Sequence, residues 1–415
     1  MKKNKMVFIR NFGILTAALF LTQNIFAYND LFRKWVQDIE KYNLSLQEQK
    51  IKIDLYKTRR LTALEVPHSR GAIEIVSNGQ VYTIEQRIPF PGKTVINELM
   101  LDKEYKIKKT LYENKKMEII GELKRAYIYI YHKYKIILLV KEMYNMIDQM
   151  EIQILAQSMF GKMSLSRANA LKIEKVKFQD IINVHEMKKK KRMNDLMNIL
   201  NNNITAEEIE TSLPDTKIEL YDLNGLNPSD LVFASRKYRE LAYNYSQKDL
   251  LNKFEFFNFF PELSARYSYA NIQNTYSNEH YFSLAVNFPF PFPAVNKGFA
   301  FREARLNKES AEIELKQEKN SLIQRISNLI TEYEMNKRSY LVHNKDLREI
   351  TFKNLEEVKA QFIISSQVTS ADFLEAFRKY IFFQEYAIDY LANMEYALHD
   401  LEDLICADIT EVLKK

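Results

Sequence analysis

The sequence predicts a mainly helical protein with a small β part, built as two copies of one structural plan. Glycine is scarce, with 8 of 415 residues, which is typical of helical chains. Long stretches show helical periodicity, and the motif Pro-Phe-Pro follows a strand-like run twice, at 89–91 and again at 289–291. The matching order of elements around both motifs indicates a duplication.

Residues 1–27 have the features of a secretory signal peptide. Positive charges precede an apolar core, Phe12–Leu21, that is too short to span a bilayer, and Ala27 offers a cleavage point. An N-terminal anchor helix is the alternative. Cleavage near Ala27 would change the formal net charge from +6 to +2, so the bulk charge gives no case for nucleic acid binding. The basic run Lys188–Arg192 is interpreted as a solvated helix face.

The first copy spans residues 28–200. Its predicted elements are a helix over 30–64, strands over 72–76 and 80–88, a long helix over 93–158 and a half-length helix over 166–200. The turn residues Ser77-Asn78-Gly79 predict that the two strands form a hairpin. A polar segment, residues 201–226, links this copy to the next.

The second copy, residues 227–406, repeats this order, and residues 407–415 form a tail. Its predicted elements are a helix over 227–257, strands over 263–269 and 281–288, a long helix over 297–364 and a last helix over 369–404. Apolar residues at 4–3 spacing from Phe373 to Ile405 predict a coiled-coil seam, and a looser seam runs from Leu322 to Ile350. Since each long helix would extend for about 100 Å, we expect a tall cylinder of aligned helices.

The four strands alternate between one apolar, aromatic face and one small, polar face. Phe282, Leu284 and Val286, for example, are interleaved with small and polar residues. This alternation is typical of strands in a membrane barrel, although a sheet packed on the helices would give the same pattern. Four strands cannot close a barrel, for which about eight is the practical minimum, so we expect several copies of the chain to share one.

Prolines stand where each copy passes from its second strand to its long helix. Proline lacks the N–H that strand pairing needs, and it disfavours helix in the residue before it. We therefore expect short extended strand-to-helix joints at these positions. The residues concerned are Pro89, Pro91, Pro289 and Pro291.

The order of elements resembles that of the TolC-like outer-membrane efflux proteins. The resemblance covers about residues 30–405 and is most specific in the stretches RIPFPGK, FFPELSARYSYA, YFSLAVNFPF and SSQVTSADFLEAFRKY. It implies a duplicated TolC-like fold, in which a long coiled-coil α-barrel is continued by a twelve-stranded β-barrel that a homotrimer shares, with four strands per chain.

The same resemblance implies a function. Such a trimer would be a passive exit duct of a tripartite efflux pump or a type I secretion system, placed in the lipid of the cell outer membrane and extending into the periplasm. Its partners would be a periplasmic adaptor protein and an inner-membrane transporter. The stretch IPFPGK looks most like members that serve heavy-metal efflux, but drugs and polypeptides stay open as cargo.

The resemblance also implies a gate at the periplasmic tip. Asp372 and Glu375 match the two gate carboxylates of the family, with glutamate replacing the usual second aspartate, and Asn169 takes the acidic position in the first copy. No arginine stands in the second turn, where Gln367 lies nearest, so an arginine latch is not carried over to this chain. Three copies of the two acids would form a ring that concentrates cations. Alternatively, Thr369-x-x-Asp372 is simply a helix start.

No residue pattern for catalysis or metal binding is evident. The six histidines lack metal-ligand spacing, and there is neither a glycine-rich phosphate loop nor a nucleophile motif. The only cysteine, Cys406, excludes an intrachain disulfide. The sequence therefore predicts no enzyme activity and no cofactor. The alternative to a duct is a periplasmic coiled-coil scaffold or interaction protein without a pore.

Overall fold

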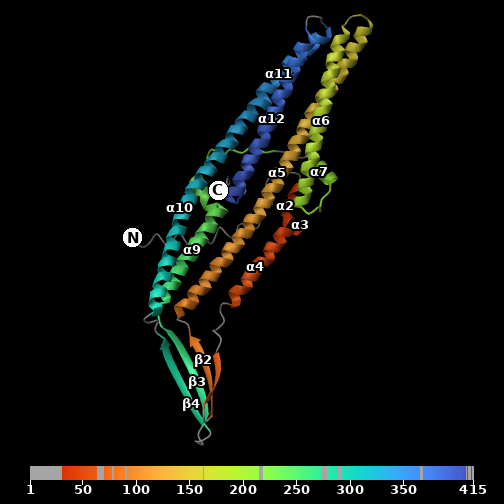
Figure 1. Ribbon diagram of the computed structural model, residues 1–415. Coiled ribbons are helices and arrows are strands. Elements are labelled where there is room, and N and C mark those ends of the chain that lie inside the picture. The colour runs from red at the N-terminus through yellow and green to blue at the C-terminus, as the bar shows by residue number, and fades with distance from the viewer. Residues whose placement is uncertain are drawn as a thin grey trace.

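The protein forms an elongated bundle of helices with a small antiparallel sheet at one end (Figure 1). The computed structural model describes residues 30–62, 70–76, 79–88, 91–161, 163–214, 218–272, 278–287, 292–364, 368–407, 409 and 413. Two helix-to-helix turns lie at the end of the bundle that is far from the sheet (Figure 1). The predicted fold class, mainly helical with a small β part, is confirmed.

The first half of the chain contains a broken helix, a hairpin and two long helices. These are α2 (Asp30–Gln37), α3 (Ile39–Tyr42), α4 (Leu44–Thr62), β1 (Arg70–Val76), β2 (Gly79–Ile88), α5 (Pro91–Met159) and α6 (Leu165–Ile199). The prediction of one continuous helix over 30–64 is wrong. Asn43 ends α3 in an extended conformation, where its side chain donates to the carbonyl of Ile199 at 3.0 Å and accepts from the N–H of Leu46 at 3.2 Å.

The second half repeats the hairpin and the long helices. Its elements are α7 (Ala206–Ser212), α8 (Pro228–Leu231), η1 (Val232–Ala234), α9 (Arg236–Phe257), β3 (Glu262–Ile272), β4 (Asn278–Asn287), α10 (Phe292–Leu341), η2 (Val342–Leu347), α11 (Arg348–Ile364) and α12 (Ser370–Ile405). Helix α9 packs on α10 and α5, while α12 packs on α10, α11 and α5. Helix α10 begins at Phe292, five residues before the predicted start at Lys297. Pro293 is tolerated there because the N–H groups of a first helical turn have no partners within the helix.

The hairpins of the two halves join into one sheet with the order β1-β2-β3-β4. All three pairings are antiparallel, and β2 and β3 form the junction between the halves. Tyr82 lies opposite Tyr269 there, with ring centroids 6.2 Å apart, and Thr83 lies opposite Ser268. The register places the apolar residues of neighbouring strands on one face of the sheet.

The core is a column of buried side chains along the bundle. Aromatic rings dominate it near the two turns, where Phe362 stacks on Phe373 at 5.0 Å and Phe178 meets Phe377 edge-on at 5.5 Å. The predicted seam of α12 is confirmed, because nine of its ten residues are buried and Leu391 is half-buried. Strict 4–3 spacing keeps this stripe on one side of α12, where it packs against α5, α10 and α11.

A π-helical segment, η2, interrupts the long helix of the second half. A π turn holds more residues than an α turn, so it rotates the following side chains to a different face. Ile326 and Tyr333 before the segment are buried, whereas Ile350 after it is 64 % exposed, and Leu355 occupies the buried position instead. The prediction of one seam continuing to Ile350 is wrong for this reason.

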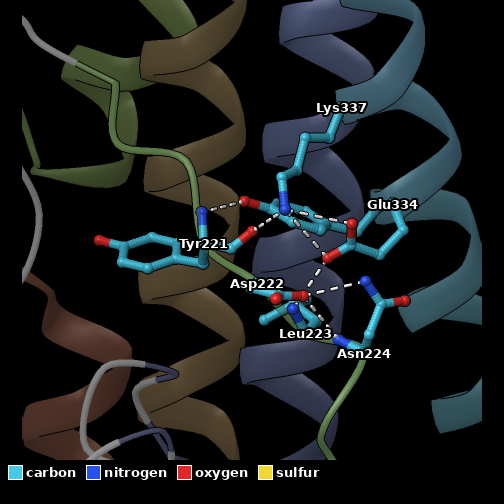
Figure 2. A network of polar contacts seen from close by, with 7 residues as sticks. Tyr221, Asp222, Leu223, Asn224, Glu334 and Lys337 are labelled. Atoms are coloured by element: carbon cyan, nitrogen blue, oxygen red, sulfur yellow. Dashed lines mark hydrogen bonds and ion pairs between the residues drawn. The ribbon is translucent and has the colours of Figure 1, made fainter. Parts of the chain in front are cut away.

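An extended segment, residues 218–226, crosses the bundle and is fastened to α10; we call it the strap (Figure 2). The N–H of Leu223 donates to Glu334 Oε1 at 2.8 Å. The ammonium group of Lys337 donates to the carbonyl of Tyr221 and pairs with Glu334 at 3.2 Å. The side chain of Leu223 is fully buried, so the strap is anchored by both packing and hydrogen bonds.

Candidate functional site

The sheet has one apolar face that is exposed rather than packed on helices. Phe282 and Leu284 are each 71 % exposed, and Ile73 is 68 % exposed. The large apolar side chains that share this face, which we call the apolar face, are Ile73, Tyr82, Ile84, Leu263, Tyr267, Phe282, Leu284 and Val286. An exposed patch of this kind marks a surface for a partner or a lipid phase. The interpretation of an ordinary sheet packed on the helices is therefore wrong.

The opposite face of the sheet, the polar face, carries charges and hydroxyl groups. Glu85 Oε2 pairs with Arg266 Nη2 at 3.1 Å, and Glu85 Oε1 lies 3.8 Å from Arg87 Nε. The hydroxyl groups of Thr83 and Ser268 are 3.1 Å apart across the junction of the two hairpins. The side chains of Arg266 and Arg87 are 55 % and 53 % exposed, and charged groups on one face of a sheet indicate that this face contacts water.

Each outer strand of the sheet has one edge that is unpaired in the part of the chain that the structure describes. Within the described residues, β1 pairs with β2 alone and β4 pairs with β3 alone. Strands β2, β3 and β4 have 10, 11 and 10 residues, and a strand of about 9–11 residues crosses a bilayer. An open edge of such strands has unpaired backbone groups that can pair with a second copy.

The end far from the sheet contains the predicted gate residues. Asp372 lies in the first turn of α12 and forms a reciprocal cap with Thr369: its Oδ2 accepts from the Thr369 N–H at 2.9 Å and from the hydroxyl at 2.6 Å. The hydrogen bond from the Thr369 side chain, followed by that from its N–H, lowers the pKa of Asp372. The capping role, which the sequence offered as the alternative, is therefore present.

The remaining gate candidates occupy the same end of the bundle. Glu375 is exposed one turn after Asp372 and pairs with Lys379 at 2.7 Å, while Asn169 is exposed in the first turn of α6. Gln367 lies outside the described residues. Within one chain the described side chains of these candidates are not joined by a common contact, and their role in a gate stays a prediction.

An arginine that the sequence interpretation missed connects the two turns. Arg167, at the start of α6, donates to the carbonyl of Phe362 at 3.3 Å and to the carbonyl of Val368 at 2.8 Å, on either side of the turn before α12. Its guanidinium also lies 5.1 Å from the centre of the Phe362 ring. In the turn between α5 and α6, close to Arg167 in the sequence, Gly161 has a φ of 70°. This left-handed conformation, which glycine tolerates, follows the end of α5.

A second contact between the halves lies about two helical turns further from the tip. Arg378 on α12 makes two hydrogen bonds to Glu174 on α6, and Lys177 lies 3.3 Å from the same carboxylate. Burial would raise the pKa of Glu174, but the hydrogen bonds from Arg378 and Lys177 outweigh it, so the pKa is lowered. Glu174 is therefore an ionised, buried carboxylate with fixed partners.

Of the four predicted proline joints, the structure describes one, Pro91. Strand β2 ends at Ile88 and Pro91 is the first residue of α5, a position where the missing N–H costs no helical hydrogen bond. Pro89, Pro289 and Pro291 fall outside the described residues.

The described part of the chain holds no cluster of three or more acidic, histidine or cysteine side chains that is arranged for a metal ion. Among its helices, the search for a membrane-spanning segment of sufficient length and apolarity found none.

Comparisons with known proteins show what the fold resembles. No protein-family profile matches the sequence, and no curated protein matches it. Several solved structures match in fold, among them three at sequence identities of 10–14 %. A membrane protein from Pseudomonas aeruginosa is 14 % identical, with 92 % of each chain covered and a TM-score of 0.75.

Two further matches are outer-membrane proteins. The open state of the Neisseria gonorrhoeae outer membrane channel MtrE is 13 % identical, with 93 % of each chain covered and a TM-score of 0.73. The Vibrio cholerae outer membrane protein VceC is 10 % identical and covers 92 % of this chain and 97 % of its own, with a TM-score of 0.74. The chain therefore has the TolC-like fold, as the resemblance in its sequence implied.

Proposed function

We propose that the protein is a passive, trimeric duct in the cell outer membrane that serves as the exit of a tripartite efflux pump or a type I secretion system. The observation that carries this proposal is the sheet, whose apolar face is exposed and whose two outer edges are open. A sheet of this kind is incomplete in one copy of the chain. Pairing with further copies would satisfy the edges and leave the apolar face toward lipid.

Three copies would close the sheet into one barrel. Strand β1 of each copy would pair with β4 of the next, which gives twelve strands and removes every open edge. The apolar face would then point outward, and Glu85, Arg87 and Arg266 would line a water-filled lumen. Helices α5 and α10 would continue this lumen as a tunnel into the periplasm.

Export would begin with the signal peptide, residues 1–27, and cleavage near Ala27. The duplicated plan, with copies at 28–200 and 227–406 and the linker between them, would let each chain supply two similar hairpins to the trimer. A duct has no energy source of its own, so a periplasmic adaptor protein and an inner-membrane transporter would complete the assembly. The fold is also found among outer-membrane channels, which supports this reading.

The tip far from the sheet would form the gate. The contacts of Arg167 on both sides of the α11–α12 turn would hold this turn in one position. Asp372 and Glu375 of three copies would surround the opening with carboxylates and concentrate cations there. The bond of Asp372 to Thr369 fixes its carboxylate at the helix start, and Lys379 offsets part of the charge of Glu375.

A matched pair of variants tests the duct against the periplasmic scaffold. Phe282→Arg places a charge on the apolar face, which costs about 2–4 kcal/mol in a membrane, whereas Ser283→Arg places the same charge on the polar face. The duct predicts heat-resistant trimers in outer-membrane fractions for the wild type and Ser283→Arg, and their loss for Phe282→Arg. A periplasmic monomer for all three proteins would favour the scaffold.

A further inference from the structure

A cluster of phenylalanines surrounds the point where α9 passes into β3. Its rings belong to the last turn of α9, to the short connection after it and to the third turn of α10. Three of its members are substantially exposed: Phe256 is 49 %, Phe259 is 38 % and Phe260 is 36 % exposed. We call the cluster Phe256, Phe257, Phe259, Phe260 and Phe301 the phenylalanine patch.

The patch is held together by ring contacts between helices. Phe256 meets Phe260 edge-on with 5.7 Å between the ring centroids, and Phe257 lies 5.6 Å from Phe260. Phe301 on α10 contacts Phe256 and Phe259, each at 6.2 Å. Such contacts fix the rings in place, so their exposed area is a persistent apolar surface rather than a set of mobile side chains.

Along the chain, the α9 end of the patch directly precedes the part of the apolar face that lies on β3. Phe260 is separated from Leu263 of β3 by two residues, and Leu263 is itself 46 % exposed. Its partner in register is Val286 of β4, which is 48 % exposed, so this cross-strand pair is the part of the apolar face nearest to α9. Lys297 donates to the carbonyl of Asn258 at 2.6 Å, which places its ammonium group beside the connection that carries Phe259 and Phe260.

We propose that the phenylalanine patch is a lipid-binding surface that lies in the headgroup region of the bilayer, so that membrane contact extends from the sheet onto α9 and α10. This inference rests on the proposed function. On an amphipathic surface phenylalanine rings are buried at the boundary between headgroups and acyl chains, and lysine is attracted to lipid phosphates. The competing occupant is a neighbouring copy of the chain, which would cover the rings with protein.

The single tryptophan of the chain makes a depth measurement possible. Trp35 is buried in the helical core and is replaced by phenylalanine to give a tryptophan-free background. Tryptophan is then introduced singly by Phe256→Trp and Phe260→Trp in the patch, and by Phe282→Trp on the apolar face. Ile313→Trp is the control, since Ile313 is 56 % exposed but lies about 30 Å along α10 from its first residue.

Each variant is reconstituted into phosphatidylcholine vesicles that carry bromine either near the glycerol backbone or near the chain ends. We expect Phe282→Trp to lose most fluorescence to the deep bromines, Phe256→Trp and Phe260→Trp to lose most to the shallow bromines, and Ile313→Trp to be unaffected by both. If Phe282→Trp is quenched while both patch tryptophans behave like Ile313→Trp, the patch lies outside the membrane and the inference fails, although the duct survives. If Phe282→Trp is not quenched either, the proposed function fails as well.

A second label does not depend on a tryptophan fitting into the patch. Phe256→Cys in a Cys406→Ser background carries a nitroxide, whose collisions with oxygen and with a water-soluble nickel chelate report its depth. The inference predicts greater access to oxygen than to the chelate in vesicles, with the reverse order for Ile313→Cys. Equal profiles for the two sites, or low access of both reagents at Phe256→Cys as expected under a second copy, would overturn it.

Discussion

The guanidinium of Arg378 on α12 binds the carboxylate of Glu174 on α6 through two hydrogen bonds, at 3.1 and 2.9 Å. These residues are 204 positions apart and belong to different halves of the chain. The carboxylate of Glu174 is buried, whereas the side chain of Arg378 is 55 % exposed. The pair therefore joins the two helical hairpins near the tip at one fixed point.

Arg378→Ala should weaken this junction by about 2 kcal/mol, because it removes the main partner of a buried carboxylate while Lys177 and solvent compensate in part. Hydrogen exchange of the backbone amides in α6 and α12 measures the loss of protection. The control Lys353→Ala breaks a solvent-exposed pair with Glu349 and should leave the protection of α6 and α12 unchanged. Equal effects of the two substitutions would contradict a structural role for the Glu174 pair.

Arg167→Ala should raise the conductance of the reconstituted channel. Without the guanidinium, the carbonyls of Phe362 and Val368 lose their common partner, and the turn between α11 and α12 is released. Planar-bilayer recording measures the change. Arg125→Ala is the control, since it breaks an ion pair with Asp400 that lies away from the tip. The side chains of Arg125 and Asp400 are 31 % and 48 % exposed. An Arg167→Ala channel with wild-type conductance would argue against a role of Arg167 in holding the turn closed.

The charge at the tip can be separated from the capping role of Asp372. Asp372→Asn combined with Glu375→Gln removes both charges but retains an oxygen that can accept from the Thr369 N–H. We expect the double variant to lose cation preference, so the reversal potential in a salt gradient should shift toward that of a non-selective channel. Thr369→Ala weakens the cap and keeps the charges, so its selectivity should match that of the wild type. The carboxylate ring is ruled out if the double variant retains full cation preference.

A buried chain of titratable groups joins α12 to α5. Glu402 Oε2 lies 2.9 Å from Lys124 Nζ and 3.1 Å from His399 Nδ1, and His399 Nε2 lies 3.6 Å from Glu395. Burial, followed by the charge of Glu402, raises the pKa of Glu395 to about 8, and burial lowers the pKa of His399. Burial would also raise the pKa of Glu402, but the charge of Lys124 and the contacts with His399 lower it.

The raised pKa of Glu395 predicts a dependence of stability on pH. The folded protein holds a proton on Glu395 that the unfolded chain releases above its ordinary pKa of 4.5, so stability falls as pH rises from 4.5 to about 8 and levels off above. The expected slope from this group is about 1.4 kcal/mol per pH unit. Glu395→Gln should remove it, as seen in Tm measured across this range. The exposed control Glu349→Gln should leave the slope unchanged, and a wild-type slope in Glu395→Gln would refute the assignment.

The strap should loosen when its bond to Tyr333 is removed. The N–H of Tyr221 donates to the hydroxyl of Tyr333 at 2.7 Å, and the ring of Tyr333 is fully buried. Tyr333→Phe keeps the ring and leaves the N–H without this acceptor, at a cost of about 1 kcal/mol. Limited proteolysis between residues 214 and 226 measures the effect, with Tyr340→Phe on the same helix as control. Equal cleavage rates would show that the packing of Leu223 and the bonds to Glu334 and Lys337 hold the strap without the Tyr333 hydroxyl.

Periodic features of the molecule were predictable from the sequence. The seam of α12 is a repeated spacing within one helix, and the alternation of Phe282, Leu284 and Val286 marks one face of one strand. Each pattern therefore identifies its element without knowledge of the helix or strand that packs against it. The paired hairpins follow from turn residues and from the duplicated Pro-Phe-Pro motif. These signals are sufficient for the fold class and for the exposed apolar face.

Contacts between distant positions have no such signature. Arg167 contacts Phe362 and Val368, which lie 195 and 201 positions later in the chain, and Lys124 contacts Glu402, 278 positions later. No spacing in the sequence predicts either contact. The π-helical segment Val342–Leu347 depends on a change of hydrogen-bond pattern rather than on residue type, which is why the seam was extended wrongly to Ile350. The break at Asn43 depends on a hydrogen bond to Ile199 in another helix.

Single-particle microscopy of the detergent-extracted particle shows whether several chains share one barrel. We expect threefold symmetry, with β1 of each copy paired to β4 of its neighbour in a closed barrel and with Phe282 and Leu284 facing the detergent. A particle that contains one chain, or an assembly in which these two side chains are buried against protein while β1 and β4 stay unpaired, would contradict it.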